Sequence, residues 1–454
     1  MPPKVSGWPV VGALPQLARR HLDFMLDMRE RHGDVYRLDF GRAEVMFFAH
    51  PDHAKHILID CGPNYRDKGG EDGFRAGHFP LMGKGLATVT GDGSSWKKQR
   101  RIMQPYFLKK QLKALVELMI ESVGKSLGPL EEACDTRQPI DISEEITRIS
   151  MNVIGLTVFG FEIPPSQADP LAEAIREVMD YTWWGTLANM LPQGTPLPGR
   201  KRYNQAIETV HERVADLVKR SLDEDRFDRF LIAQMHPAMQ EMGDDEAAKA
   251  YLHIEALTIL IAGYESTAAS FSWAFHLLSR HPKVMKKLQE EILNVVGEAV
   301  VTAEHIPRLV YARQVVKEVL RLYAPSYWMQ RRAQEDDEID GFFVPAGAIV
   351  APMIHLVHYH PEIWPEPTKF DPDRFAPERS SQRHKQAWIP FGAGQRRCLA
   401  EEFSLVKGQL MLVQILQKYT LAPVAGRAPE MQVGTNLRPR GGVWVELSPN
   451  RRET

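Results

Sequence analysis

A helical pattern without interruption runs from Asp245 to Ser279. It contains no proline, and Pro282 stops it shortly afterwards. At 1.5 Å per residue such a helix would be roughly 50 Å long, enough to cross a whole domain. A helix of this length usually organises a mainly α fold.

The remaining pattern is α-rich with a small β portion. Most of the chain from Trp96 to about Val296 has helical periodicity, and further helices are expected at Leu309–Tyr323 and Leu399–Lys418. Alternating runs on either side of Gly41 predict a hairpin from Val35 to Ala49. Strands are expected at 327–332 and 349–351, and a hairpin around 439–442 should lead into the final strand VWVEL. We find no internal repeat or long linker, so residues 1–454 are expected to form a single domain without a fused reductase.

Charge and cysteine content exclude several classes of protein. Lys plus Arg number 56 against 58 Asp plus Glu, a net charge of −2, which argues against a nucleic-acid-binding protein. Three cysteines are too few for a disulfide scaffold, so a reducing, cytoplasmic environment is expected.

No membrane-targeting segment is evident. The prolines at positions 2, 3, 9 and 15 interrupt the N-terminal stretch, which does not resemble a signal peptide. The most apolar window, Ala256–Phe275, contains Glu265 and is therefore interpreted as a buried core helix rather than a transmembrane anchor. The apolar, turn-rich segment Trp183–Pro198 is interpreted as a mobile lid, with contact to a membrane surface or a partner as the alternative.

The segment PFGAGQRRCLAEEF, from Pro390 to Phe403, carries the most chemical information. Cys398 lies directly before a predicted helix, and two glycines and two arginines precede it. A helix N-terminus and nearby arginines favour a thiolate, and glycines let the backbone approach a flat ligand closely. A thiolate beside an arginine suits haem, whose iron takes the sulfur and whose propionate takes the guanidinium.

Two other interpretations of Cys398 are a buried, inert cysteine after a glycine-rich turn and a nucleophilic cysteine. No histidine that could activate a nucleophile lies nearby in the sequence. Cys61 and Cys134 lie in ordinary contexts, and we assign no function to either.

The ten residues FGAGQRRCLA resemble the haem-binding signature of the cytochrome P-450 superfamily. Phe391, Gly394, Arg396 and Cys398 match its fixed elements, while Ala400 stands where the family most often has glycine. The resemblance implies a mainly α haem-thiolate monooxygenase fold with haem b (iron protoporphyrin IX) as cofactor and dioxygen as co-substrate. The positions implied to contact the cofactor in this loop are Phe391, Gly392, Arg396, Cys398 and Ala400, with Cys398 as the ligand of the metal.

Further motifs occur in the order that the family has them. Glu318 and Arg321 share one helix face, and Arg374 resembles the third member of the family's structural Glu-Arg-Arg network. Trp96 and Arg100 resemble the Trp-x-x-x-Arg pair, whose indole and guanidinium lie on one helix face and contact a haem propionate. Arg331 matches a second propionate arginine, although its neighbour Arg332 leaves that assignment open by one position.

Within the long helix, AGYEST (Ala262–Thr267) resembles the family's oxygen-activation segment. Its acid and alcohol are implied to deliver protons to dioxygen, since cleavage of the O–O bond needs two protons. Glu265 matches the acid, and Ser266 replaces the usual threonine, so we expect activity with looser coupling of electrons to product. Thr267 is the alternative source of the hydroxyl.

Scattered apolar residues are candidates for the substrate pocket, and a core-packing role is the alternative for each. They predict an apolar pocket with aromatic walls and no charged anchor for a carboxylate. The candidates are Phe79, Leu81, Met82, Ile261, Ala262, Ser326, Tyr327, Trp328, Met329 and Leu437.

Together these patterns predict a haem-thiolate monooxygenase that hydroxylates or otherwise oxidises an apolar small molecule in secondary metabolism. A terpenoid, a polyketide or a fatty-acyl-like compound is the expected substrate. Electrons are expected from a separate ferredoxin or flavodoxin and its reductase, docked on basic residues near Arg396, Arg397 and the Trp96 helix, and the protein is expected to be a monomer. The alternatives are a peroxide-driven haem-thiolate enzyme and a non-enzymatic haem-binding sensor.

Overall fold

The computed structural model describes residues 1–5, 7–8, 11–40, 43–68, 79–89, 93–189, 198–223 and 230–450. Its description of side chains leaves out Phe79, Lys109, Met242 and residues 183–189. The predicted lid Trp183–Pro198 therefore lies almost entirely outside the described side chains.

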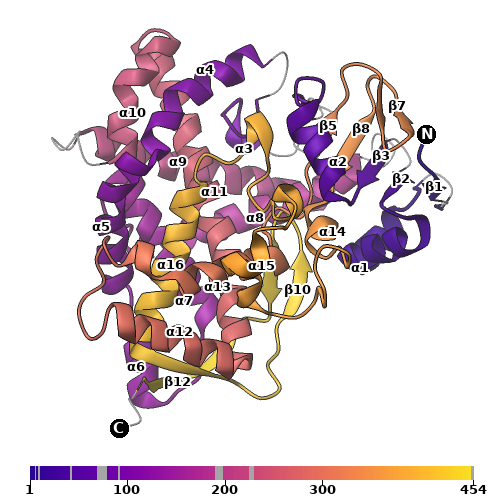
Figure 1. The fold of residues 1–454 in the computed structure, drawn as a ribbon. Helices are drawn as coiled ribbons and strands as arrows, with labels where there is room; N and C mark the ends of the chain where they lie inside the picture. The colour runs from indigo at the N-terminus through magenta and orange to yellow at the C-terminus, as the bar shows by residue number, and fades with distance from the viewer. Residues whose placement is uncertain are drawn as a thin grey trace.

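A long central helix, α11 (Asp245–Arg280), organises the molecule (Figure 1). The Asp244 side chain caps its N-terminus by accepting a hydrogen bond from the Ala247 amide at 2.9 Å, and Pro282 follows its last turn. Most of its side chains from Glu255 to Ser279 are buried, because neighbouring helices cover it on several sides. The prediction of a helix from Asp245 to Ser279 is confirmed.

The helical body fills the left and centre of Figure 1. Around α11 it comprises α4 (Ser94–Met103), α5 (Lys109–Lys125), α6 (Gly128–Thr136), α7 (Ile142–Ile154), α8 (Pro165–Asn189), α9 (Arg200–Asp223), α10 (Leu231–Met239), α12 (Pro282–Val295), α13 (Val310–Leu322) and α16 (Glu401–Lys418). Shorter helices are α1 (Leu14–His32), α2 (Pro51–Lys55), α3 (Phe79–Met82), α14 (Ile354–His358) and α15 (Pro377–Ser380).

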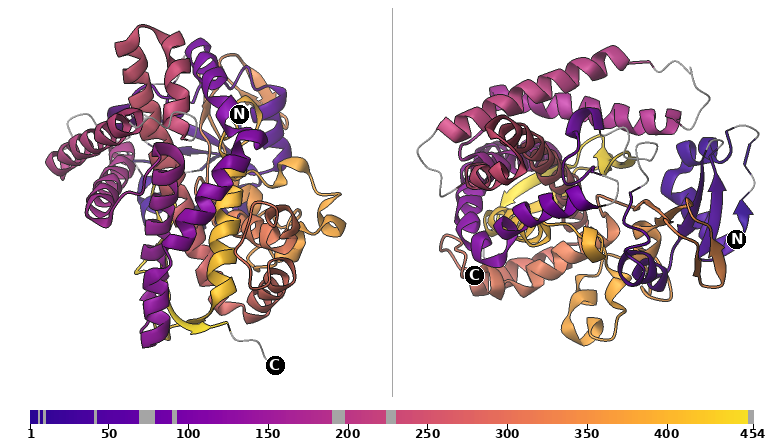
Figure 2. Two further views of the ribbon diagram at one scale, coloured as in Figure 1. Left: turned by 90° about the vertical axis from the view of Figure 1, so that its left-hand side faces the viewer. Right: turned by 90° about the horizontal axis from the view of Figure 1, so that it is seen from above.

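A five-stranded sheet lies to one side of this body, as the right-hand panel of Figure 2 shows. Its strands, in spatial order, are β1 (Lys4–Val5), β2 (Val35–Asp39), β3 (Glu44–Phe48), β8 (Ile349–Pro352) and β5 (Arg331–Arg332). β2 and β3 form the predicted antiparallel hairpin, in the register Val35 opposite Phe48. β3 and β8 pair in parallel, so residues far apart in the sequence meet in this sheet.

The remaining strands form three small sheets. β6 (Asp337–Ile339) pairs with β7 (Phe342–Val344), β10 (Glu430–Val433) pairs with β11 (Leu437–Arg440), and β12 (Trp444–Pro449) lies between β4 (Ile140–Asp141) and β9 (Tyr419–Pro423). The mainly α fold with a small β portion is thus confirmed. None of the helices within the described residues is both long and apolar enough to cross a bilayer.

Two strand predictions need correction. The turn at Gly441 and Gly442 does not close a hairpin between β11 and β12, because the chain leaves one sheet there and enters another. The Asp141 carboxylate accepts a hydrogen bond from the Val443 amide at 2.8 Å and so draws the chain toward α7. The strand expected at 327–332 pairs only over Arg331–Arg332, since the preceding residues line a cavity.

Candidate functional site

A cavity of about 410 Å³ lies between α11 and the loop Pro390–Ala400, which we call the cysteine loop. Cys398 lines one side of it, and Ala262, Glu265 and Ser266 from α11 line another. Cys61 and Cys134, which the structure also describes, do not line it. Two segments more than a hundred residues apart in the sequence therefore face one space.

The cysteine loop needs glycine at position 394. Gly394 has φ +67°, and a Cβ there would lie 1.7 Å from the Leu58 carbonyl oxygen in the helical turn η1 (His56–Asp60). The loop closes with a hydrogen bond from the Cys398 amide to the Phe391 carbonyl at 2.9 Å. This tight turn presents the sulfur to the cavity just before α16 begins.

Opposing influences act on the Cys398 thiol. Burial is the largest and raises its pKa, while a hydrogen bond from the Ala400 amide to the sulfur and the positive charges of Arg100 and Lys68 lower it. Cys398 is exposed in the structure and lines the cavity. A metal ion bound from the cavity would stabilise the thiolate.

Cationic side chains surround the same end of the cavity. Arg100, Arg331 and Arg396 all line it, and the Arg396 guanidinium lies 4.3 Å from the centre of the Trp96 ring. Arg100 is held by a hydrogen bond from its Nη1 to the Arg397 carbonyl at 2.6 Å. The eight residues that the sequence nominated for cofactor contact all line this cavity: Trp96, Arg100, Arg331, Phe391, Gly392, Arg396, Cys398 and Ala400.

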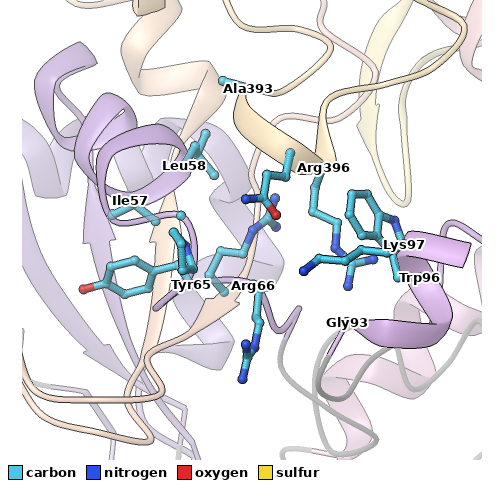
Figure 3. Close-up of a pocket in the computed structure, with 13 residues that line it drawn as sticks. Ile57, Leu58, Tyr65, Arg66, Gly93, Trp96, Lys97, Ala393 and Arg396 are labelled. Carbon is cyan, nitrogen blue, oxygen red and sulfur yellow. The ribbon is translucent and has the colours of Figure 1, made fainter. Parts of the chain in front are cut away.

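A smaller cavity of about 90 Å³ adjoins it behind Trp96, Arg331 and Arg396 (Figure 3). Arg66 and Lys97 also lie around this smaller cavity, so it adds two further cations to those that line the large cavity. An anionic group at this end of the large cavity would therefore be surrounded by positive charge.

The structure distinguishes the two adjacent arginines of β5. Arg331 is 5% exposed and lines both cavities, whereas Arg332 lines neither and its amide donates to the Asp67 carbonyl at 2.9 Å. Lys68, which the sequence analysis missed, is buried beside the large cavity and its Nζ donates to the Ala87 carbonyl at 2.8 Å. No local pattern marks a single lysine in an irregular segment, so only its spatial neighbours reveal it.

Glu318, Arg321 and Arg374 meet in the interior. Arg321 makes two hydrogen bonds to the Glu318 carboxylate, at 2.7 and 2.8 Å, and Arg374 Nε lies 3.4 Å from Glu318 Oε1. Arg321 also donates to the carbonyls of His358, Pro367 and Lys369, so the pair fixes the irregular chain after α14.

His358 connects this network to the cysteine loop. The Ile389 amide donates to its Nε2 at 2.9 Å, so the proton of the neutral ring is on Nδ1, which donates to the Arg321 carbonyl at 3.0 Å. Burial, with a contribution from the nearby Arg321 charge, lowers the pKa of His358 to about 3 and keeps the ring neutral. No sequence pattern indicates this contact.

The α11 segment presents Glu265 and Ser266 to the cavity. The Ser266 hydroxyl donates to the Ala262 carbonyl at 2.5 Å. Thr267 is buried, its hydroxyl donates to the Gly263 carbonyl at 2.9 Å, and it is not among the residues that line the cavity. Of the two hydroxyls, the structure therefore brings only that of Ser266 to the site.

The Glu265 carboxyl is almost enclosed by protein. Burial raises its pKa, and the attraction of Arg438 and a hydrogen bond with the Asn436 side chain oppose this shift. Arg438 Nη1 lies 3.8 Å from Glu265 Oε1, and Nη2 of the same guanidinium pairs with Asp180, which is partly exposed. Glu265 is thus connected to the surface through charged groups that the sequence analysis did not find.

Most candidate substrate contacts also line the cavity: Met82, Ile261, Ala262, Ser326, Tyr327, Trp328 and Met329. Leu81 and Leu437 do not, because both side chains are fully buried in hydrophobic clusters. The side chain of Phe79 lies outside the described residues. Thr258, Thr435 and Asn436 line the cavity and were missed.

The donor set fits haem. One thiol can supply the axial ligand, four cations (Lys68, Arg100, Arg331 and Arg396) can receive two propionates, and the walls between them are mostly apolar. The family model for cytochrome P450 matches residues 2–445. The chain belongs to the cytochrome P450 family. It is a haem-dependent monooxygenase that binds its haem through a cysteine thiolate and uses dioxygen to oxidise an apolar small molecule with electrons from redox partner proteins.

Relatives of this P450 include named monooxygenases. The chain is 30% identical to cyclooctat-9-en-7-ol 5-monooxygenase of Streptomyces melanosporofaciens, over 92% of this chain and 89% of that protein. It is 28% identical to pentalenene oxygenase of Streptomyces avermitilis, over 95% and 94% of the two chains. The crystal structure of the cytochrome P450DA heme domain has the same fold, with a TM-score of 0.86 and 24% identity over 99% and 98% of the two chains.

Proposed function

We propose that this P450 oxidises a terpenoid and that Cys398 would hold the iron of its haem. One observation carries the proposal: the Cys398 sulfur and the Glu265–Ser266 pair line the same cavity, whose other walls are mostly apolar. Two relatives named for the oxidation of cyclooctat-9-en-7-ol and pentalenene support the terpenoid class. The peroxide-driven and sensor alternatives are not favoured, since the relatives are monooxygenases.

Haem, when bound, supplies the activation of dioxygen and the transfer of one oxygen atom to the substrate. Arg100, Arg331 and Arg396 would bind the propionates, with Lys68 as a fourth cation. The apolar wall from Ile261, Trp328 and Met329 would hold the hydrocarbon and exclude water.

Glu265 and Ser266 would provide protons on the α11 side. Burial raises the pKa of the Glu265 carboxyl and so favours its protonated form, which can donate a proton. Ser266 Oγ, which faces the cavity, could donate a hydrogen bond into it in place of its bond to the Ala262 carbonyl. Arg438, which pairs with the partly exposed Asp180, lies beside Glu265 and favours its ionised form after the proton is given up.

We also propose that a separate acidic ferredoxin or flavodoxin supplies the electrons. Lys97 is an exposed cation on α4, beside Trp96 and the smaller cavity. The three cysteines are free, as expected in the cytoplasm.

A substrate screen tests the terpenoid proposal. The holoprotein is titrated with cyclic sesquiterpenes and diterpenes, and with fatty acids and polyketide lactones as comparison, while the haem spin state is followed by absorption. Hits are incubated with NADPH and a surrogate ferredoxin and reductase, and products are analysed by mass spectrometry. We expect spin shifts and products one oxygen atom heavier for terpenes. Turnover of the comparison compounds alone would contradict the proposal.

A further inference from the structure

A buried ammonium group lies behind the cavity-lining segment of α11. Lys407 of α16 has no exposed surface, and its Nζ lies 3.1 Å from the Gly263 carbonyl oxygen, 2.7 Å from Ser150 Oγ and 3.2 Å from the Ser150 carbonyl oxygen. Every one of these partners is uncharged. The assigned chemistry of the site uses neither Lys407 nor Ser150.

The hydrogen bonds around Nζ account for all three of its protons. The two carbonyl oxygens can only accept, and the Ser150 hydroxyl uses its own proton for the Tyr264 carbonyl at 2.9 Å. Ser150 Oγ must therefore accept from Lys407. Burial lowers the pKa of Lys407 well below its ordinary value, but three accepting atoms favour the ammonium form, which alone has three N–H groups.

Side-chain donors reach three successive carbonyls of α11. The Ala262 carbonyl accepts from Ser266, that of Gly263 from both Thr267 and Lys407, and that of Tyr264 from Ser150. Hydroxyls that donate back to a helix carbonyl bend helices, because they compete with the amide of the next turn. Lys407 and Ser150 donate hydrogen bonds to carbonyls of the same turn from outside the helix.

The helices pack closely at this point. A Cβ at position 263 would lie 2.7 Å from Ile154 Cδ1 of α7, so α11 and α7 approach closely there. Lys407 and Ser150 are both fully buried in this contact. A methionine of similar length would fill the volume of Lys407 without the cost of burying an ammonium.

We infer that Lys407 is a positioning residue for the oxygen side of the haem cavity: by holding the Gly263 carbonyl, together with Ser150, it sets the course of α11 and hence the position of Ser266 Oγ. Lys407 itself does not line the cavity, so it acts on the site through the backbone of α11. Its loss would let the Gly263–Tyr264 peptide turn back toward the helix axis and would move the neighbouring hydroxyl.

Infrared spectroscopy of carbon monoxide bound to the ferrous holoprotein tests this inference. The C–O stretching band responds to hydrogen bonds and charges that face the ligand, and the measurement needs neither substrate nor redox partner. Its outcome is therefore separate from that of the substrate screen. The first variant is Lys407→Met. The second is Ser150→Ala in α7, a smaller change that can be measured should Lys407→Met fail to fold. Ser266→Ala provides the reference for a change at the hydroxyl itself.

Gln414→Met is the matched control. Gln414 is also buried in α16 and donates to a helix carbonyl, that of Ile120 at 3.2 Å, but this carbonyl belongs to α5. We expect the band of Lys407→Met to split or to move by more than its width, that of Ser150→Ala to move in the same direction, and that of Gln414→Met to stay unchanged. An unchanged band in Lys407→Met or, where it does not fold, in Ser150→Ala would overturn the inference. So would an equal change in Gln414→Met, which would indicate general loosening of the core.

Discussion

At the scale of single residues, the site depends on which of two adjacent hydroxyls reaches the cavity. Successive residues of a helix point about 100° apart, so the side chains of Ser266 and Thr267 leave the helix in different directions. The structure places Ser266 at the cavity and turns Thr267 inward, to the Gly263 carbonyl. The sequence alone could not decide between them, because the motif identifies Glu265 as the acid but does not show how the helix is rotated relative to the cavity.

Replacing the hydroxyls separately tests this difference. In Ser266→Ala we expect product formed per NADPH to fall by at least about tenfold and peroxide to rise, since a positioned proton donor contributes on the order of 10²–10⁴ in rate. Thr267→Val removes the other hydroxyl and keeps the branched shape, and should leave this ratio near that of the wild type. Product and peroxide are measured for a turned-over terpene from the screen. The reverse ranking of the two variants would assign the role to Thr267.

His358 makes stability depend on pH. Its pKa is about 3 in the folded protein and 6.5 when exposed, so between these values the unfolded chain binds more protons. The free energy of unfolding should therefore fall as the pH falls below 6.5, by up to about 1.4 kcal/mol per pH unit from this residue.

Denaturant unfolding of His358→Gln between pH 7 and pH 5 measures this contribution. The variant should be less stable at pH 7 by about 1–3 kcal/mol, because buried hydrogen bonds are lost. Its dependence on pH should also be less steep than that of the wild type. Parallel curves for the two proteins would show that His358 does not titrate in this way.

At the scale of elements, hydrogen bonds between segments far apart in the sequence hold the cysteine loop. Glu318 and Arg321 were predictable as a pair from their spacing, and Arg374 from the resemblance. Their connection to the loop through His358 and Ile389 was not, because it depends on backbone amides and carbonyls that carry no sequence signal. The mistaken hairpin at Gly441 and Gly442 has a similar cause, since turn residues do not specify which strand follows.

Gly394→Ala should weaken the cysteine loop. An alanine there would meet the Leu58 carbonyl and would also hold a positive φ, which costs about 1–2 kcal/mol by itself. We expect a lower haem content per polypeptide and a lower unfolding temperature. Gly426→Ala is the control, because Gly426 has φ +74° but no atom near the position of a Cβ. An equal loss of haem in both variants would mean that backbone strain, and not the contact with Leu58, is responsible.

At the scale of the whole molecule, the two ends offer different surfaces to a redox partner. α4, which carries Lys97, lies at the top of Figure 1, and α12 lies at the bottom in both side views (Figures 1 and 2). Lys97 lies at the smaller cavity, and cations that line this cavity also surround one end of the haem cavity. Electrons entering at the α4 end would therefore have a short distance to travel.

Charge reversal at the two ends tests the docking proposal. Lys97→Glu should raise the KM for an acidic surrogate ferredoxin several-fold at low salt, and the difference should shrink as ionic strength rises. Lys286→Glu on α12 is the control, since Lys286 is also an exposed lysine. The rate at which ferredoxin reduces the haem of this P450 is measured by absorption at increasing ferredoxin concentration. An equal effect of both variants would mean that only the net charge of the protein matters, which would contradict docking at Lys97.

The absorption spectrum of the reduced, carbon monoxide-bound protein tests the central claim most directly, namely that Cys398 binds the haem iron. The wild type, Cys61→Ser and Cys134→Ser should show the strongly red-shifted Soret band of thiolate-ligated haem. Cys398→Ser should lose this band. A thiolate-type band that persists in Cys398→Ser would contradict the account.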